Sequence, residues 1–422
     1  MARYRLFSAQ HSLNKVVFSR VLLPVAISLS SMYLSSKHQC DDSDDELVLA
    51  SQVIFSKRRK ILTFSQVFVK AADDILRAYI SFRGGLHAVE TFENDAGIFD
   101  WDSYCNKLFV QDFRFSKQQV EAIVHCLIVN CNFPTHVVSY AGDKSELRIA
   151  FLMLCMKYAW PTRLGHIRRL FGTSISRISR VIKALREMIF QRFFPKMRCP
   201  NVLSADQIQR FAHAVSEKSG IDVVFGFLDG TVRPICRPSI GQSEFYTGKD
   251  RLHAIKFQIC STPDGIIRHI DGPWPGRRHD AHMVNSSPLS TGSPALASWI
   301  LAHPPTRWGT QFVVFADQGY YKQPGIEVPW PDAEFNVEHA IFNDLMKTSR
   351  IAVEWEFGHI LEHWAALHYR PGQKILTNMK LGQMYIVAAF LTNVFNCLHP
   401  SKTSLYFNCA PPSLEGYLSS LE

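Results

Sequence analysis

The pattern of apolar and polar positions changes its period once along the chain. From about residue 113 to 198 apolar residues recur at helical spacing, which predicts helices over 147–159 and from 175 through 189. From 221 onward the apolar residues form short continuous runs. These runs predict strands over 221–228, 253–261, 266–270 and 311–316. Further helices are predicted over 339–346, 351–367 and 381–398. Strands with helices between and after them predict a mixed α/β domain behind an all-α region.

Two helices of the first zone fit a helix-turn-helix. A short helix after Pro161 carries Leu164, Ile167 and Leu170 and is expected to end at Gly172. Ser174 is a good N-cap for the next helix. Earlier in this zone, Ser116 and Gln119 have the form of a capping box.

Basic charge is concentrated in the same zone. The whole chain has a net charge of +9, whereas residues 144–198 carry thirteen Lys or Arg and two acids, a net +11. Such clustering favours binding of nucleic-acid phosphates. The residues expected to contact DNA are Arg177, Arg180, Lys183 and Arg186. An ordinary helical bundle with a solvated basic face is the alternative interpretation.

The first sixty residues read as an extension and linker. Residues 1–40 contain no acid, 41–46 are acidic, and 57–60 are four consecutive basic residues that resemble a nuclear-import signal. The acid-free start is also typical of a mitochondrial transit segment. The expected organisation is therefore an extension (1–60), a helical DNA-binding region (61–200), a catalytic domain (221–400) and a C-terminal tail (401–422).

Other features narrow the class of protein. An apolar fraction of 47% with 30 Phe excludes a disordered chain. Ten scattered cysteines without a CxxC pair indicate free thiols in a reducing compartment. The uncharged run 21–36 is short for a membrane span, and 381–401 contains polar residues typical of a buried helix, so no membrane partner is expected.

Acidic residues supply the candidate chemistry. Asp229 follows one apolar run and Asp317 another, so both are expected at strand ends that a ligand can reach. A third acid would come from the helix after Arg350, where Glu354 and Glu356 flank the apolar stripe equally; Gly358, one turn beyond Glu354, modestly favours Glu354. Three such carboxylates suit Mg²⁺ or Mn²⁺ in phosphodiester cleavage, although each aspartate could simply occupy a turn.

Several sequence segments make the chain resemble the PIF/Harbinger group of DDE-type transposases and the Harbinger transposase-derived nucleases. They are GFLDGTVRPICRP (226–238), HAIKFQICSTPDGII (253–267), GPWPGRRHDA (272–281), ADQGYY (316–321), RIAVEWEFGHI (350–360) and QMYIVAAFLTN (383–393). The resemblance implies an RNase H-like nuclease domain with Asp229, Asp317 and Glu354 as catalytic and metal-binding residues. It also assigns GRRHD to the family pattern, with Asp280 and His279 in supporting roles and Arg277 and Arg278 near phosphates.

The chain departs from the family pattern at two places, and the resemblance implies a function, a location and a partner. Gln318 stands where the family often has proline or lysine, and residues 1–60 match no part of it. The resemblance implies a metal-dependent DNA endonuclease in the nucleus, often working with a Myb-like DNA-binding partner. Homo-oligomerisation is compatible with it. The alternative function is a catalytically silent DNA-binding or scaffold protein, and the alternative location is the mitochondrion.

Overall fold

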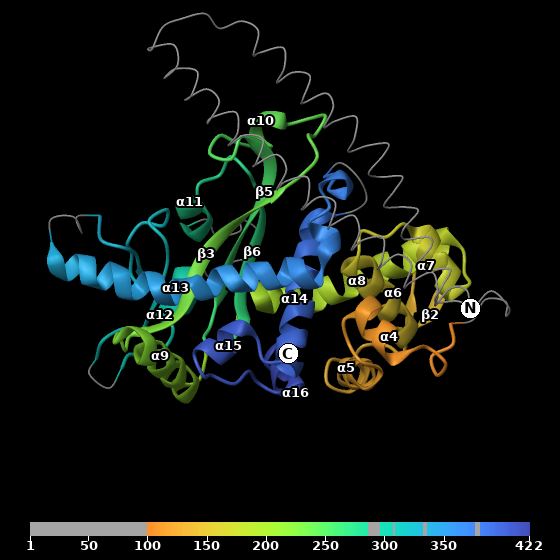
Figure 1. The fold of residues 1–422 in the computed structure, drawn as a ribbon, viewed down its shortest axis with the longest axis horizontal. Coiled ribbons are helices and arrows are strands. Elements are labelled where there is room, and N and C mark those ends of the chain that lie inside the picture. Colours follow the sequence, from red (N-terminus) through yellow and green to blue (C-terminus); the bar gives the residue numbers. More distant parts are fainter. Residues whose placement is uncertain (1–98, 286–295, 307–308, 332–335, 376–379) are drawn as a thin grey trace, which may run out of the picture. The chain divides into compact units, whose positions relative to one another are not determined.

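The computed structural model describes residues 99–285, 296–306, 309–331, 336–375 and 380–422 (Figure 1). They all belong to one compact unit, residues 84–422. The predicted extension, with its acidic and basic runs, lies outside the described residues. The cysteines of the described part are free thiols, as predicted.

The first part of this unit is helical. Its helices are α4 (Asn106–Phe113), α5 (Lys117–Val129), α6 (Leu147–Ala159), α7 (Leu164–Phe171) and α8 (Ile175–Arg198). The predicted caps are confirmed: Ser116 and Gln119 form a capping box, and the Ser174 hydroxyl accepts from the Arg177 amide. Gly172 ends α7 in the left-handed region at φ 61°, which produces the predicted turn into α8.

The helical region is not purely α-helical. Strands β1 (His136–Val138) and β2 (Lys144–Glu146) pair antiparallel between α5 and α6. Strand β1 packs against α8. The expectation of an all-α region missed this hairpin because its strands are only three residues long, too short for a recognisable alternation.

A six-stranded mixed sheet follows α9 (Ala205–Ser219). Its strands are β3 (Val224–Pro234), β4 (Tyr246–Thr247), β5 (Leu252–Ser261), β6 (Ile267–Pro275), β7 (Val313–Phe315) and β8 (Ile326–Glu327). The path β6-β5-β3-β7-β8 is antiparallel through its first three strands and parallel through its last three, while β4 pairs with the start of β5. This arrangement confirms the predicted mixed α/β, RNase H-like architecture.

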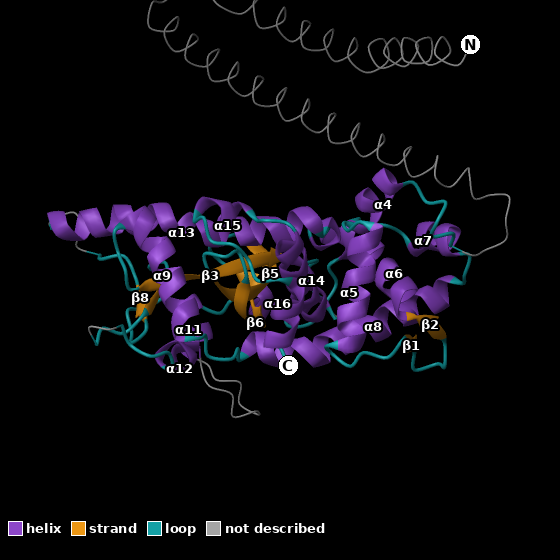
Figure 2. Ribbon diagram, turned by 90° about the horizontal axis from the view of Figure 1, so that it is seen from below, coloured by secondary structure: helices purple, strands orange, loops and turns teal. Residues whose placement is uncertain are grey.

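Helices cover this sheet. Short helices α10 (Gln242–Phe245), α11 (Asp280–Asn285) and α12 (Leu296–Leu301) lie in its connections, and α13 (Val337–His363), α14 (Leu381–Leu398), α15 (Lys402–Tyr406) and α16 (Leu414–Ser420) follow it. Figure 2 shows α13 running along one side of the strands.

The sequence predicted two helices where α13 is continuous. The polar run 347–350 suggested a boundary, yet it contains no Gly or Pro to break a helix.

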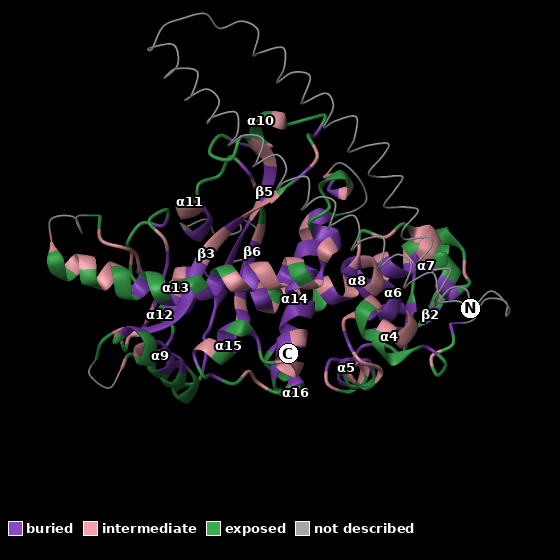
Figure 3. Ribbon diagram, in the orientation of Figure 1, coloured by how far each residue is buried: buried purple, intermediate pink, exposed green. Residues whose placement is uncertain are grey.

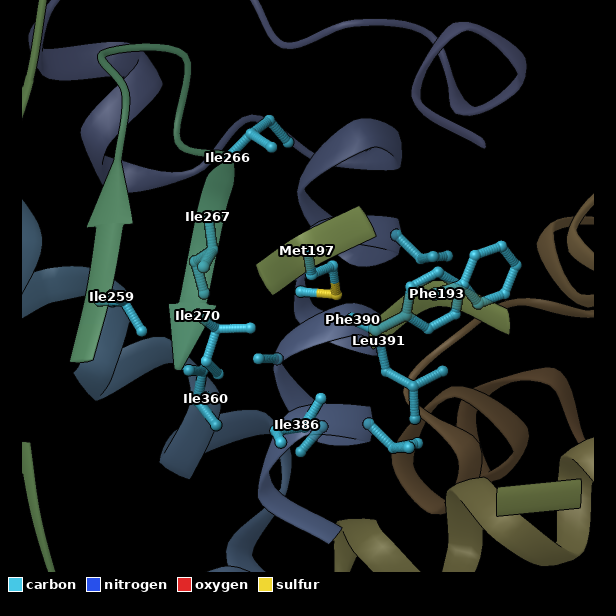
Figure 4. Close-up of a cluster of buried hydrophobic side chains, with 14 of the residues drawn as sticks. Phe193, Met197, Ile259, Ile266, Ile267, Ile270, Ile360, Ile386, Phe390 and Leu391 are labelled. Atoms are coloured by element: carbon cyan, nitrogen blue, oxygen red, sulfur yellow. The ribbon is translucent and has the colours of Figure 1, made fainter. Parts of the chain in front are cut away.

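Helix α14 is the centre of the core. It is long and apolar enough to cross a membrane, but 78% of it is buried inside the protein, as the sequence predicted for a core helix (Figure 3). Phe390 of α14 stacks on Phe193 of α8 with ring centroids 4.3 Å apart. Figure 4 shows these rings in one cluster with Ile267 of β6 and Ile360 of α13. The helical region and the sheet therefore share one hydrophobic core.

Candidate active site

Asp229 and Asp317 are placed side by side by adjacent parallel strands. Phe227 of β3 pairs with Phe315 of β7, and each aspartate lies two residues further along its strand direction. Asp317 follows the end of β7, as predicted. Asp229 does not end its strand, because β3 continues to Pro234 through its pairing with β5. The two carboxylates nevertheless lie at the same edge of the β3–β7 pair.

Glu354 reaches this region from α13 through Arg350. The Arg350 guanidinium donates to Asp229 Oδ2 at 3.4 Å and to Glu354 Oε1 at 3.2 Å. Burial raises the pKa of Asp229 to about 6, with further upward contributions from Asp317 and Glu354, whereas Arg350 and the Gly230 amide lower it. Arg350 thus partly neutralises a set of mutually repelling carboxylates.

Asp280, at the start of α11, joins the same site. A Cβ on Gly319 would lie 3.0 Å from Asp317 Oδ1 and 3.4 Å from Asp280 Oδ2. A Cβ on Gly230 would lie 3.2 Å from Asp280 Oδ1. Glycine at both positions therefore lets the two carboxylates approach the backbone. Lys256 of β5 holds Asp280 in place with its Nζ 3.1 Å from Oδ1.

Tyr320 lies near these acids, with its hydroxyl 3.1 Å from the position that a Cβ on Gly230 would take. Its side chain is fully buried, and its hydroxyl has no hydrogen-bond partner among the described residues. Burial raises the pKa of Tyr320 far above its usual range, and Asp280, Asp229 and Asp317 raise it further. A buried hydroxyl facing three carboxylates is a donor that a water molecule or a substrate oxygen would satisfy.

Glu354 and Glu356, which the helical periodicity could not separate, have different environments. The Glu354 side chain is 54% exposed and faces Arg350, whereas Glu356 is completely buried. Glu356 accepts from the Thr403 hydroxyl at 2.6 Å and from the Asn396 amide at 3.1 Å. Glu354 is therefore the acid of α13 that lies with Asp229, and Glu356 belongs to the core.

The acidic side chains of this site are of the ligand type that a hard divalent cation prefers. Carboxylates are the ligands that Mg²⁺ and Mn²⁺ prefer. Burial raises the pKa of Asp229, and the charges of Asp317 and Glu354 add to that rise. Within the described residues, however, no three acidic, histidine or cysteine side chains are arranged to hold one metal ion. Arg350 occupies the position between Asp229 and Glu354 that a cation would share.

His279, expected in a supporting role, and Arg186, expected to contact DNA, have very different exposure. His279 is exposed at the turn before α11, next to Asp280. Arg186 of α8 was predicted to contact DNA, but its side chain is only 5% exposed against the helical core. That expectation was wrong because Arg186 lies on the buried stripe of α8 beside Leu185 and Ile189.

The other predicted DNA contacts are already engaged within the protein. Arg180 forms an ion pair with Asp143 in the β1–β2 turn, with its Nη2 3.0 Å from Oδ1, and Arg177 donates to the Lys144 carbonyl at 2.7 Å. The Lys183 ammonium lies 5.6 Å from the centre of the Tyr140 ring. The unpredicted hairpin and its turn thus contact the three predicted DNA-binding residues of α8 that are not buried.

Sequence reasoning missed three residues of the site: Lys256, Tyr320 and Arg350. The position of Arg350 could have been predicted from the sequence, because it stands one helical turn before Glu354, the spacing of an i,i+4 ion pair. Lys256 is a charged residue in a strand whose side chains are mostly buried, and a buried ammonium group requires an acidic partner. Tyr320 follows Asp317 closely in ADQGYY and could have been suspected for that reason.

Comparison with known proteins found a family match for part of the chain. Residues 228–393 match the family model described as DDE superfamily endonuclease. The match runs from Leu228 in β3 to Asn393 within α14 and includes Asp229, Asp280, Asp317 and Glu354. Comparison with curated proteins and with solved structures gave no match.

Proposed function

We propose that this protein is a divalent-metal-dependent DNA endonuclease of the DDE type, related to the Harbinger transposases. The observation that carries the proposal is the pairing of β3 with β7, which sets Asp229 and Asp317 at one edge of an RNase H-like sheet. Asp280 and Glu354 add carboxylates from two helices. The match of residues 228–393 to the DDE superfamily endonuclease family supports this interpretation.

Each side chain has a role in this proposal. Asp229, Asp317 and Glu354 would hold Mg²⁺ or Mn²⁺, with Asp280 as a fourth carboxylate. When bound, such ions would supply an activated water and stabilisation for the leaving 3′ oxygen of a phosphodiester. Arg350 then exchanges its carboxylate partners for the scissile phosphate, since a guanidinium binds both groups in the same geometry. Tyr320 donates its hydroxyl toward an oxygen in the site.

The experiment is nicking of supercoiled plasmid by the purified full-length chain with Mg²⁺ or Mn²⁺. Asp229→Asn, Asp317→Asn and Glu354→Gln should each lower the rate at least a hundredfold without loss of helical circular dichroism. Asp344→Asn, an exposed acid on α13, is the matched control and should cleave normally. Normal cleavage by the Asp229 and Glu354 variants would refute the assignment.

A silent DNA-binding or scaffold protein is the second candidate. It is favoured by the Arg350 contacts and by the lack, among the described side chains, of a ready three-ligand metal set. DNA binding without metal-dependent nicking, under conditions where the fold is intact, would decide for this candidate. The four intact acids favour the nuclease.

We further propose that the protein acts in the nucleus, with a Myb-like protein as a DNA-binding partner and with self-association. Free cysteines suit a reducing compartment. Imaging of tagged chains with and without residues 1–40 tests the location. An organellar signal that becomes nuclear only after truncation would point to a transit segment instead. Pull-down and light scattering test the partner and the self-association.

A further inference from the structure

A basic concavity lies at the turn between α7 and α8, away from the carboxylates. It has a volume of about 600 Å³ and is lined by Arg163, His166, Arg168, Arg169, Gly172 and Ile175, among others. The three arginines are exposed. They come from both ends of α7: Arg163 is its N-cap residue, and Arg168 and Arg169 lie in its last turn.

Among the described residues that line the concavity, none is acidic. Between residues 147 and 204 the sequence contains one acid, Glu187. Glu187 is bound to Lys380 of the loop before α14, with the atoms 2.7 Å apart. Among the described residues, none of the three arginines has an acidic partner within ion-pair distance, in contrast to Arg180 of α8, which is paired with Asp143. The guanidinium groups in the concavity are therefore available to an outside anion.

The shape and chemistry indicate a phosphate backbone. A guanidinium presents a planar fork of donors that matches phosphate oxygens. No Phe, Tyr or Trp is found among the residues that line the concavity, so it offers no platform on which unpaired bases would stack. Gly165 and Gly172 also line the concavity. A Cβ on Gly165 would meet no atom within 4 Å, so the space beside it is open. Duplex DNA, whose phosphates are exposed and whose bases are already stacked, suits this surface.

We propose that this α7 concavity, rather than the outer face of α8, contacts the phosphate backbone of duplex DNA. The proposal rests on the proposed DNA endonuclease function and specifies where that function holds its substrate. The β1–β2 hairpin occupies Arg177 and Arg180, and Arg186 is buried, so α8 has few basic groups left for phosphate. The concavity brings together, at α7 and its N-cap, three guanidinium groups without an acidic partner in the described part of the chain.

The test measures binding of a fluorescent mixed-sequence duplex to the full-length chain in EDTA over a range of salt. The test variant is Arg163→Gln with Arg168→Gln and Arg169→Gln, and the matched control is Arg177→Gln with Arg180→Gln and Lys183→Gln. Each removes three positive charges. For the α7 variant we expect at least a tenfold loss of affinity. The salt slope, which is the fall of log affinity with log salt concentration, should be smaller by about 2 to 3, since each phosphate contact contributes about 0.9 to it. The control should keep most of its affinity and slope.

Three other results have distinct meanings. If the α7 variant binds as wild type does while the α8 control loses affinity, the inference is overturned and the endonuclease proposal stands. If the wild-type chain binds single-stranded RNA but no duplex DNA, both proposals fail. If the α7 triple variant does not fold, the single Arg163→Gln and Arg169→Gln variants and the triple lysine variant replace it. Unchanged salt slopes in both glutamine singles would then overturn the inference.

Discussion

The hydroxyl of Thr403 donates a 2.6 Å hydrogen bond to the buried carboxyl of Glu356. This bond joins α15 to α13, the helix that carries Glu354. Asn396 of α14 donates to the other Glu356 oxygen and also to the Gly265 carbonyl in the β5–β6 turn. Helices from the end of the chain thereby fix the rotation of α13 about its axis, and with it the direction in which Glu354 points.

Glu356→Ala should therefore destabilise the protein more than Glu356→Gln does. The alanine variant leaves the Thr403 hydroxyl and the Asn396 amide buried without their partner, at a cost of about 2 to 4 kcal/mol. The glutamine variant keeps an acceptor for one of them and should cost about half as much. Urea unfolding measures both. Equal stability of the two variants and wild type would show that the network does not hold α13.

The stability of the wild-type protein should contain a component that falls as pH rises. Burial raises the pKa of Glu356 from 4.5 to about 8. The folded state therefore keeps a proton that the unfolded chain releases, so this stabilisation is complete below about pH 4.5 and is lost as pH approaches 8. Asp229 acts in the same direction, whereas burial lowers the pKa of His363 to about 4, which removes stability as pH falls below 6.5.

Glu356→Gln isolates the Glu356 component, because the other groups titrate alike in both proteins. The difference in the free energy of unfolding between wild type and variant should shrink between pH 5 and pH 8. A difference that stays constant over this range would mean that Glu356 is ionised in the folded protein.

Arg350→Gln should strengthen metal binding. Arg350 contacts both Asp229 and Glu354, so its cation competes with a divalent ion for the same oxygens. Calorimetric titration of Mn²⁺ at pH 8, where Asp229 is ionised, should show a several-fold tighter site in the variant. Lys347→Gln, an exposed residue of the same helix, is the control. Weaker Mn²⁺ binding by Arg350→Gln would show that Arg350 positions the acids instead of competing for them.

The sequence was sufficient for the class of fold and for the region of the site. The apolar runs at 221–228 and 311–316 predicted the two strands whose parallel pairing sets Asp229 beside Asp317. Periodicity could not decide between Glu354 and Glu356, because both flank the same buried stripe. What separates them is Thr403 and Asn396, two residues far along the chain that only the folded structure brings to Glu356.

For the DNA contacts, the sequence pattern indicated a helix but could not show which of its basic residues are free. A basic helix after a turn is a local pattern, and it indicated α8. Which of its residues are free depends on a hairpin of two short strands that places Asp143 against Arg180. No periodic signal in the sequence reveals that contact. The same charge count that favoured α8 also includes Arg168 and Arg169, whose exposure in a concavity becomes visible only in three dimensions.

Lys256 and Asp280 should be energetically coupled. Their atoms lie 3.1 Å apart with side chains 13% and 29% exposed, so Asp280 loses a partly buried cation in Lys256→Met. A double-mutant cycle with Asp280→Asn, measured by urea unfolding, should give a coupling of about 1 kcal/mol, with the double variant more stable than additivity predicts. Additive effects would mean that the pair contributes nothing to holding Asp280 beside Gly230 and Gly319.

Gly358→Ala should stabilise the fold and slow DNA cleavage. Gly358 lies inside α13, one turn beyond Glu354, and a Cβ there would meet no atom within 4 Å. Alanine in a helix interior is about 1 kcal/mol more favourable than glycine, so the free energy of unfolding should rise by up to that amount. If the protein is the proposed endonuclease, the new methyl group would stand beside a carboxylate of its site, Glu354, and nicking should fall severalfold. Gly226→Ala is the contrasting variant: its Cβ would lie 2.8 Å from the Ser261 carbonyl oxygen of the paired strand, so it should destabilise the sheet. A Gly358→Ala protein that is more stable and cleaves at the wild-type rate would show that the open space beside Glu354 is not needed for catalysis.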